Sequence, residues 1–210
     1  MNQPDDLVAD SVRRLLARHG AHQASRAVPI QGLPVDLWRA IVDAGLPLVL
    51  VSEPGSDPRD ALRDGVTILR ECAYQSAPVP LAEAMLANWL IGQAGWPPEP
   101  GFATVAIADD RAAVDLPAAA GAGAEAMAIL VRTPWGRAAD AVYALARDGV
   151  LCRVIRVDAA HWKLRAGLDL AGEPRDTLEI DSQAIAAARV SAAAVDALEL
   201  LALAGLLRAS

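Results

Sequence analysis

Residues 59–95 read RDALRDGVTILRECAYQSAPVPLAEAMLANWLIGQAG, and this stretch decides the fold of the first half of the chain. It holds two helix-length segments with the turn sequence Ser76-Ala77-Pro78-Val79-Pro80 between them. Proline lacks a backbone donor and disfavours helical backbone in the residue before it, so one helix ends ahead of this turn and another begins after it. We therefore predict a helix that ends at about Gln75 and a second helix over residues 81–95.

The helical pattern extends over the first 99 residues. Residues 4–20 begin with acidic and end with basic side chains, which complements a helix dipole, and their apolar residues recur every three or four positions. Residues 35–44 form a second helical segment, and Ser56 or Asp57 can cap the helix that follows it. Residues 1–99 are therefore predicted to form an all-helical N-terminal domain.

The character of the sequence changes at the cluster Pro97-Pro98-Glu99-Pro100-Gly101. The apolar runs beyond it are strand-length and bounded by Asp, Gly or Pro; they read ATVAIA, AMAILVR, AVYALAR, LCRVIRV and DTLEID. The Asp148-Gly149 pair between two of them is a hairpin signal. Because no helix-length stretch separates the runs, a parallel sheet of β-α-β units is not favoured. Residues 100–182 are predicted to form an antiparallel β sandwich or barrel, which makes the fold class α+β.

The last segment, residues 183–210, is predicted to be helical throughout and to begin a C-terminal helical domain. Nearly every residue from 192 to 207 is Ala, Val, Leu or Gly, and Asp196 and Glu199 are the two charged exceptions. A helix that is apolar around most of its circumference has to be surrounded by other helices. We therefore expect the chain to stop partway through a larger helical bundle and to be sticky or oligomeric.

Composition narrows the class of protein. The formal net charge is −7, from 19 Lys plus Arg against 26 Asp plus Glu, which argues against nucleic-acid binding. The apolar stretch 192–207 is shorter than the ~20 residues of a membrane-spanning helix and carries two acids, so no span is predicted. Cys72 and Cys152 are predicted to be buried free thiols in a cytoplasmic protein. The histidines lack neighbours at metal-ligand spacing, so no metal site is predicted.

Several segments resemble the acyl-CoA dehydrogenase family. LWRAIVDAGLPLVLVSEPGS (37–56) is similar to the family's Trp-containing helix, which ends in Ala-Gly-Leu before an acidic Pro/Gly loop, and APVPLAE (77–83) is similar to its Ala-Pro-x-Pro turn. VRTPWGRAADAVYALAR (131–147) resembles a strand pair of the middle domain, and LAGEPRDTLEID (170–181) resembles the strand that returns to the helical bundle. The resemblance covers the whole chain. It implies an N-terminal helical domain, a middle β domain and the first helix of the C-terminal domain.

This resemblance implies a flavoenzyme. Members of the family use FAD to oxidise acyl-CoA thioesters to 2,3-enoyl products: a carboxylate base removes the α-proton while the β-hydrogen leaves as hydride. An acyl-CoA substrate, a role in lipid or steroid degradation, a homo- or hetero-oligomer with acyl-CoA dehydrogenase-like chains, and an electron-transferring flavoprotein as acceptor are implied with it. The resemblance also implies that Trp135 and the nearby Thr133 contact the cofactor, and it leaves Glu199, the only acid late in the last helix, as a weak candidate for the base.

The family pattern is broken at three places. The flavin-facing Trp-Ile-Thr/Ser-Asn is here Trp135-Gly136-Arg137-Ala138, the segment AIADDRAAVD (106–115) lacks the family's glycine and serine, and the Arg-x-x-Phe-Gly segment that grips the flavin diphosphate is absent. Two hypotheses stay open. The chain is either a FAD-dependent acyl-CoA dehydrogenase that is incomplete alone, or a non-catalytic structural subunit or remnant that pairs with an active dehydrogenase chain.

Overall fold

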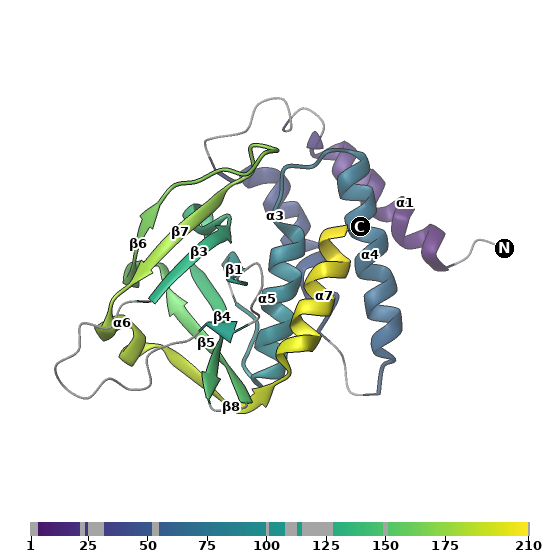
Figure 1. Ribbon diagram of the computed structural model, residues 1–210. Coiled ribbons are helices and arrows are strands. Elements are labelled where there is room, and N and C mark those ends of the chain that lie inside the picture. Colours follow the sequence, from purple (N-terminus) through teal and green to yellow (C-terminus); the bar gives the residue numbers. More distant parts are fainter. Residues whose placement is uncertain are drawn as a thin grey trace.

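The computed structural model describes residues 4–21, 24, 32–51, 55–99, 101–107, 113–114, 128–148 and 151–209. Helices occupy one side of the molecule and two β-sheets the other, and the last helix returns to the helical side (Figure 1). The predicted α+β class is confirmed.

The four predicted N-terminal helices are all found among the described residues. They are α1 (Pro4–Arg18), α3 (Val35–Asp43), α4 (Pro58–Tyr74) and α5 (Leu81–Gln93), with a short 3-10 turn, η1 (Leu46–Leu48), after α3. Asp57 caps α4, because its carboxylate accepts a hydrogen bond from the backbone N–H of Arg59 at 2.9 Å. The prolines of the turn before α5 stop α4 and allow the chain to restart, as the sequence indicates.

In the described residues, eight strands form two sheets. The larger sheet contains β1 (Ala103–Val105), β2 (Ala113–Val114), β4 (Ala141–Asp148), β5 (Leu151–Asp158) and β8 (Arg189–Val195), and the smaller contains β3 (Ala128–Pro134), β6 (Trp162–Arg165) and β7 (Arg175–Ile180). β4 and β5 pair antiparallel with Asp148 opposite Leu151, which confirms the hairpin predicted there. Short 3-10 turns, η2 (Gly136–Ala138) and η3 (Ala159–His161), follow β3 and β5.

The prediction of a purely antiparallel sheet is wrong for two strands. β1 and β2 both pair with β4 in the parallel sense, so the larger sheet is mixed. β1 follows α5 in the chain and pairs with β4, not with the next strand in the sequence. The pattern of apolar residues within a strand does not indicate which strand it pairs with, or in which direction. Across the described ranges the strands form two open sheets and no closed barrel.

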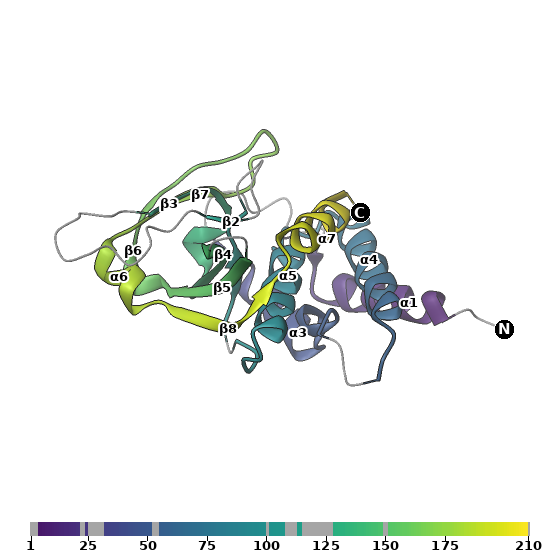
Figure 2. The same cartoon turned by 60° about the horizontal axis from the view of Figure 1, so that its bottom comes forward.

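The larger sheet is buried on both faces. Successive residues of β4 alternate between them: Tyr143 and Leu145 face the helices, whereas Val142 and Ala144 face the smaller sheet. Side chains of a strand point to opposite sides in turn, so one strand contributes to two cores. Figure 2 shows the resulting layers, with the smaller sheet, the larger sheet and α5 in succession.

The prediction that residues 183–210 are helical throughout is wrong in its first half. A short helix, α6 (Ser182–Ala187), is followed by strand β8, and only then by α7 (Ala197–Ala209). The alanines of β8 favour helix intrinsically, but the free edge of β5 supplies backbone partners that override that preference. Ser191 fastens the strand to this edge, because its Oγ accepts from the Val154 N–H at 2.9 Å. Asp196 lies outside the helix and caps it, accepting from the Leu198 N–H at 2.8 Å.

α7 is covered on one side. It packs on α5 and α4, where Leu200, Ala204 and Leu207 are buried (Figure 1). Two further leucines of α7 remain accessible: Leu198 is exposed by 73% and Leu206 by 45%. None of the helices in the described ranges has the length and hydropathy needed to cross a membrane.

The two cysteines are free and buried, as the sequence predicts. Burial raises the pKa of the Cys72 thiol to about 12, so almost no reactive thiolate forms at neutral pH. We expect neither thiol to react with an aromatic disulfide reagent in the native protein at pH 8, and both to react after unfolding in guanidinium. Rapid modification of either thiol in the native state would contradict the burial of these side chains.

Candidate functional site

Trp135, the residue proposed to face a flavin, is buried in the chain's own core. It follows β3 with a left-handed backbone (φ +52°), and its side chain is only 4% exposed. It packs with Phe102, Ala84 and Ala139, while Trp38 lies partly buried beside this cluster. The ring therefore has no free face on which a flavin could stack.

Thr133 is also enclosed. Its side chain is 0% exposed, and its hydroxyl donates to the carbonyl of Leu130 at 3.3 Å, across the bulge in β3. A hydroxyl that serves a cofactor needs a free donor or acceptor at the surface. Trp135 and Thr133, as they lie, do not fit a flavin. Most of the AIADDRAAVD segment, residues 108–112 and 115, lies outside the described residues.

Glu199 lies elsewhere, in the first turn of α7. It lines a groove of about 280 Å³ between α7, α4 and α5; the other lining residues are Leu50, Pro58, Ala61, Leu62, Trp89, Ala202, Leu203 and Leu206. None of the residues that line this groove belongs to the cluster around Trp135. The structure therefore does not bring Glu199 together with Trp135 and Thr133. It does place one carboxylate beside an apolar groove.

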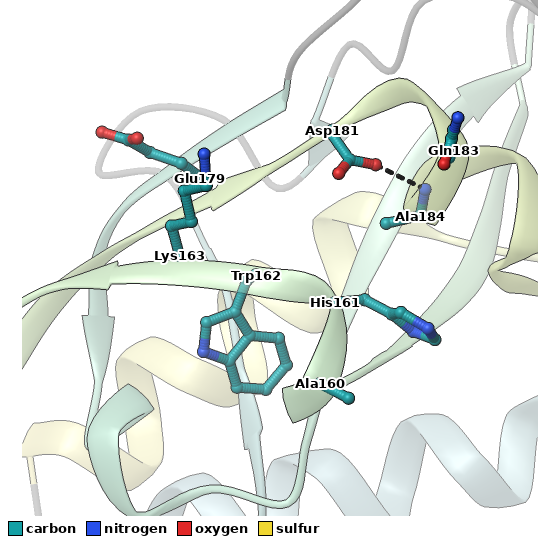
Figure 3. Close-up of a pocket in the computed structure, with 8 residues that line it drawn as sticks. All are labelled: Ala160, His161, Trp162, Lys163, Glu179, Asp181, Gln183 and Ala184. Carbon is teal, nitrogen blue, oxygen red and sulfur yellow. Dashed lines mark hydrogen bonds between the residues drawn. The ribbon is translucent and has the colours of Figure 1, made fainter.

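A larger cavity of about 450 Å³ lies at the edge of the smaller sheet, between β6, the end of β7 and α6 (Figure 3). Its polar lining is of mixed charge, with Lys163 opposite Glu179 in the β6–β7 register. Asp181 already caps α6 by accepting from the Ala184 N–H at 2.8 Å. Trp162 is partly buried and packs on the sandwich core. The residues that line this cavity form no sequence motif for ligand binding. Because they carry both positive and negative charges, they do not favour one class of ligand.

A buried ion pair joins the turn after β3 to β7. The Asp176 side chain is 0% exposed and accepts from Arg137 Nη2 at 2.6 Å, from the Arg137 backbone N–H at 2.8 Å and from the Gly167 N–H at 3.1 Å. The hydrogen bond to Asp176 raises the pKa of Arg137. The sequence does not predict this pair, because the two residues lie 39 positions apart.

A second polar cluster joins the end of the helical half to the larger sheet. The Glu99 carboxylate accepts from Tyr143 Oη at 2.5 Å and from Nε and Nη2 of Arg156 at 2.9 Å each. Hydrogen bonds from Arg156, and then from Tyr143, lower the pKa of Glu99, while burial raises the pKa of Tyr143. Next to it, the guanidinium of Arg189 on β8 lies 4.3 Å from the Trp96 ring centre, in cation–π geometry. The Arg137–Asp176 ion pair and the Glu99 cluster therefore stabilise the fold, and their charged groups are already engaged with one another.

Comparison with solved structures identifies the fold. The ChsE4-ChsE5 complex from Mycobacterium tuberculosis superposes with a TM-score of 0.69 at 19% identity, over 99% of this chain and 60% of that one. The steroid acyl-CoA dehydrogenase Tcur3481-Tcur3483 (G363A variant) gives 0.69 at 22% identity, over 97% and 60%. A glutaryl-CoA dehydrogenase from Mycobacterium smegmatis, in complex with FADH2, gives 0.57 at 13% identity, over 99% and 60%. No protein-family model and no curated protein matches the sequence.

The chain therefore has the acyl-CoA dehydrogenase fold, and the resemblance inferred from the sequence is confirmed at that level. It spans about 60% of the length of these structures. A nitrososynthase from Micromonospora carbonacea var. africana shares the fold as well, with a TM-score of 0.55 at 16% identity, over 86% of this chain and 54% of that one. The fold thus serves more than one chemistry, and function has to be argued from the residues.

Proposed function

We propose that this chain belongs to the acyl-CoA dehydrogenase family and acts as a structural subunit, paired with an active, flavin-binding chain of the same fold. The observation that carries this proposal is the burial of Trp135 and Thr133, which directs both side chains into the chain's own core. The assembly would oxidise an acyl-CoA thioester in lipid or steroid degradation and pass electrons to an electron-transferring flavoprotein. When bound in the partner chain, FAD supplies the hydride acceptor.

The exposed leucines of α7 support pairing. Leu198 is 73% exposed in the first turn of the helix, and Leu206, which is 45% exposed, lines the groove beside Glu199. Burying a leucine contributes roughly 1.5–3 kcal/mol, so covering both is a substantial part of an interface. The ChsE4-ChsE5 complex shows that chains of this fold do form heteromers.

The pairing is tested by co-expressing the chain, tagged, with acyl-CoA dehydrogenase-like chains encoded near it. We expect one such chain to co-purify at a fixed stoichiometry and the pair to reduce an electron-acceptor dye when an acyl-CoA is added. If the tagged chain is isolated as a stable monomer in every co-expression, the structural-subunit proposal is wrong.

Replacing the exposed leucines tests the surface itself. The double variant Leu198→Ser, Leu206→Ser should lower self-association of the isolated chain and weaken pairing at least ten-fold, because two apolar contacts are lost. The matched control, Leu168→Ser with Leu170→Ser, removes two leucines that are exposed by 50% and 108% on the loop between β6 and β7. Sedimentation velocity measures both. Equal effects of the two double variants would show that α7 is not the interface.

A second function is favoured by the position of Glu199. A carboxylate on the rim of an apolar groove is the arrangement that an α-proton abstraction needs, with the acyl chain in the groove and the base at its mouth. Under this alternative the chain itself is a FAD-dependent acyl-CoA dehydrogenase with Glu199 as base. Glu199→Gln would then lower kcat of the assembly by at least 100-fold, whereas a structural subunit would keep its kcat.

A further inference from the structure

An arginine-lined groove lies between α1 and α3. Figure 2 shows α1 at the end of the helical half that is farthest from the sheets. Its volume is about 400 Å³. Arg14, Arg18 and His19 line it from α1 and the residue after it, and Asp43 lines it from the end of α3. Nothing in the proposed function uses this groove.

The arginines of the groove differ from other helical arginines in their pairing. Arg13, Arg39 and Arg63 each follow an aspartate three residues earlier, and each forms an ion pair with it, at 3.0, 3.4 and 3.0 Å. This Asp-x-x-Arg spacing places the two side chains on neighbouring positions of one helix face.

Arg14 and Arg18 lack that arrangement. Three residues before them stand Ser11 and Leu15, and within the described part of the chain neither arginine has an ion-pair partner. They are one helical turn apart, so both guanidinium groups can reach one anion above the groove. The chain as a whole has a formal charge of −7, so two neighbouring arginines without an ion-pair partner among the described residues form a local positive patch.

The groove also offers an acceptor. Asp43 lies on its rim from α3, and it likewise has no ion-pair partner among the described residues. This carboxylate weakens the binding of a bare polyanion, because the two like charges repel each other. A ligand that carries a hydroxyl group beside its anionic group would instead donate to Asp43 while the arginines hold the anion. Arginine suits phosphate in particular, because its planar fork matches two phosphate oxygens.

We propose that the groove between α1 and α3 binds a phosphate-bearing, hydroxylated small molecule, with Arg14 and Arg18 on the phosphate and Asp43 on a hydroxyl. His19 lines the same groove, and its ring N–H can donate a further hydrogen bond to the phosphate. The groove includes neither Glu199 nor the exposed leucines of α7, so its ligand is independent of the proposed function.

Two probes test it by isothermal titration at constant ionic strength: inorganic pyrophosphate, which has no hydroxyl on carbon, and ribose 5-phosphate, which has several. We expect saturable binding of both. Arg14→Gln and Arg18→Gln should each weaken it roughly three- to ten-fold, and the double variant should abolish it. Arg70→Gln, an exposed arginine of α4 outside the groove, should change neither Kd. Circular dichroism checks that each variant is folded.

Asp43→Ala separates the two halves of the proposal, because alanine has neither the charge nor an acceptor. It should tighten pyrophosphate binding, because a repulsive charge is removed, and weaken ribose 5-phosphate binding, because the hydroxyl loses its acceptor. The proposal is overturned if binding does not saturate, if Arg70→Gln weakens binding as much as the groove variants do, or if Asp43→Ala shifts both Kd values in the same direction. The proposal is also overturned if Arg18→Gln lowers the thermal stability without changing either Kd. Arg18 would then act only as a favourable charge at the C-terminal end of α1.

Discussion

Replacing Asp176 by alanine is expected to destabilise the protein by about 3–5 kcal/mol, the range for removing one partner of a buried ion pair. The reason is that Arg137, at 17% exposed, would be left without its partner, and the backbone N–H groups of Arg137 and Gly167 would lose their acceptor. Denaturant unfolding followed by far-UV circular dichroism measures the free energy of unfolding.

The control for this change is Asp36→Ala. Asp36 pairs with Arg39 at 3.4 Å, but its side chain is 90% exposed, so its loss should cost less than about 1 kcal/mol. Removing both partners, Arg137→Ala with Asp176→Ala, should cost less than the sum of the two single changes, because no buried charge remains unpaired. A loss below about 1 kcal/mol for Asp176→Ala would show that the pair is not buried as described.

Glu99→Gln is expected to cost about 1.5–3 kcal/mol at neutral pH, the range for hydrogen bonds that involve charged groups. Glutamine keeps the size of the side chain and can still accept from Tyr143, but it loses the charge that holds Arg156. The consequence is a weaker connection between the end of the helical half and strands β4 and β5.

The pH dependence of this loss has a definite sign. The folded protein lowers the pKa of Glu99, so its carboxylate stabilises the fold above the unfolded value, near pH 4, and this contribution disappears as the pH falls through the folded pKa. The difference between wild type and Glu99→Gln should therefore be full at pH 7 and shrink below about pH 4. The matched control is Glu71→Gln, whose partner Arg13 is 51% exposed. A difference that grows on acidification would contradict the assignment of Glu99 as the charged partner.

The helical half was predictable because its signals are local. Asp57 followed by Pro58 marks the start of α4, and the prolines around Val79 mark its end, so nearest neighbours in the sequence determine these boundaries. The strands paired at the hairpin were predictable for the same reason, since Asp148 and Gly149 define the turn.

The features that were missed depend on distant partners. β8 is built from alanines that favour helix, and only the edge of β5 makes them a strand. β1 and β4 pair in parallel although they are far apart in the sequence, and Asp176 meets Arg137 across 39 residues. Trp135 illustrates the same limit at the candidate site: its sequence neighbours suggest a cofactor contact, but Phe102 and Ala84, both far from it along the chain, enclose its ring.

The central claim, that this chain pairs with a flavin-binding chain without holding flavin itself, is tested most directly by counting flavin in the purified chain and in the purified pair. The chain alone should carry no visible flavin absorption, and in the pair the flavin should equal the number of partner chains. Replacing the partner's flavin site should remove all of it, whereas Trp135→Phe should leave it unchanged. Yellow protein from this chain alone, or flavin in the pair that falls with Trp135→Phe, would contradict the account.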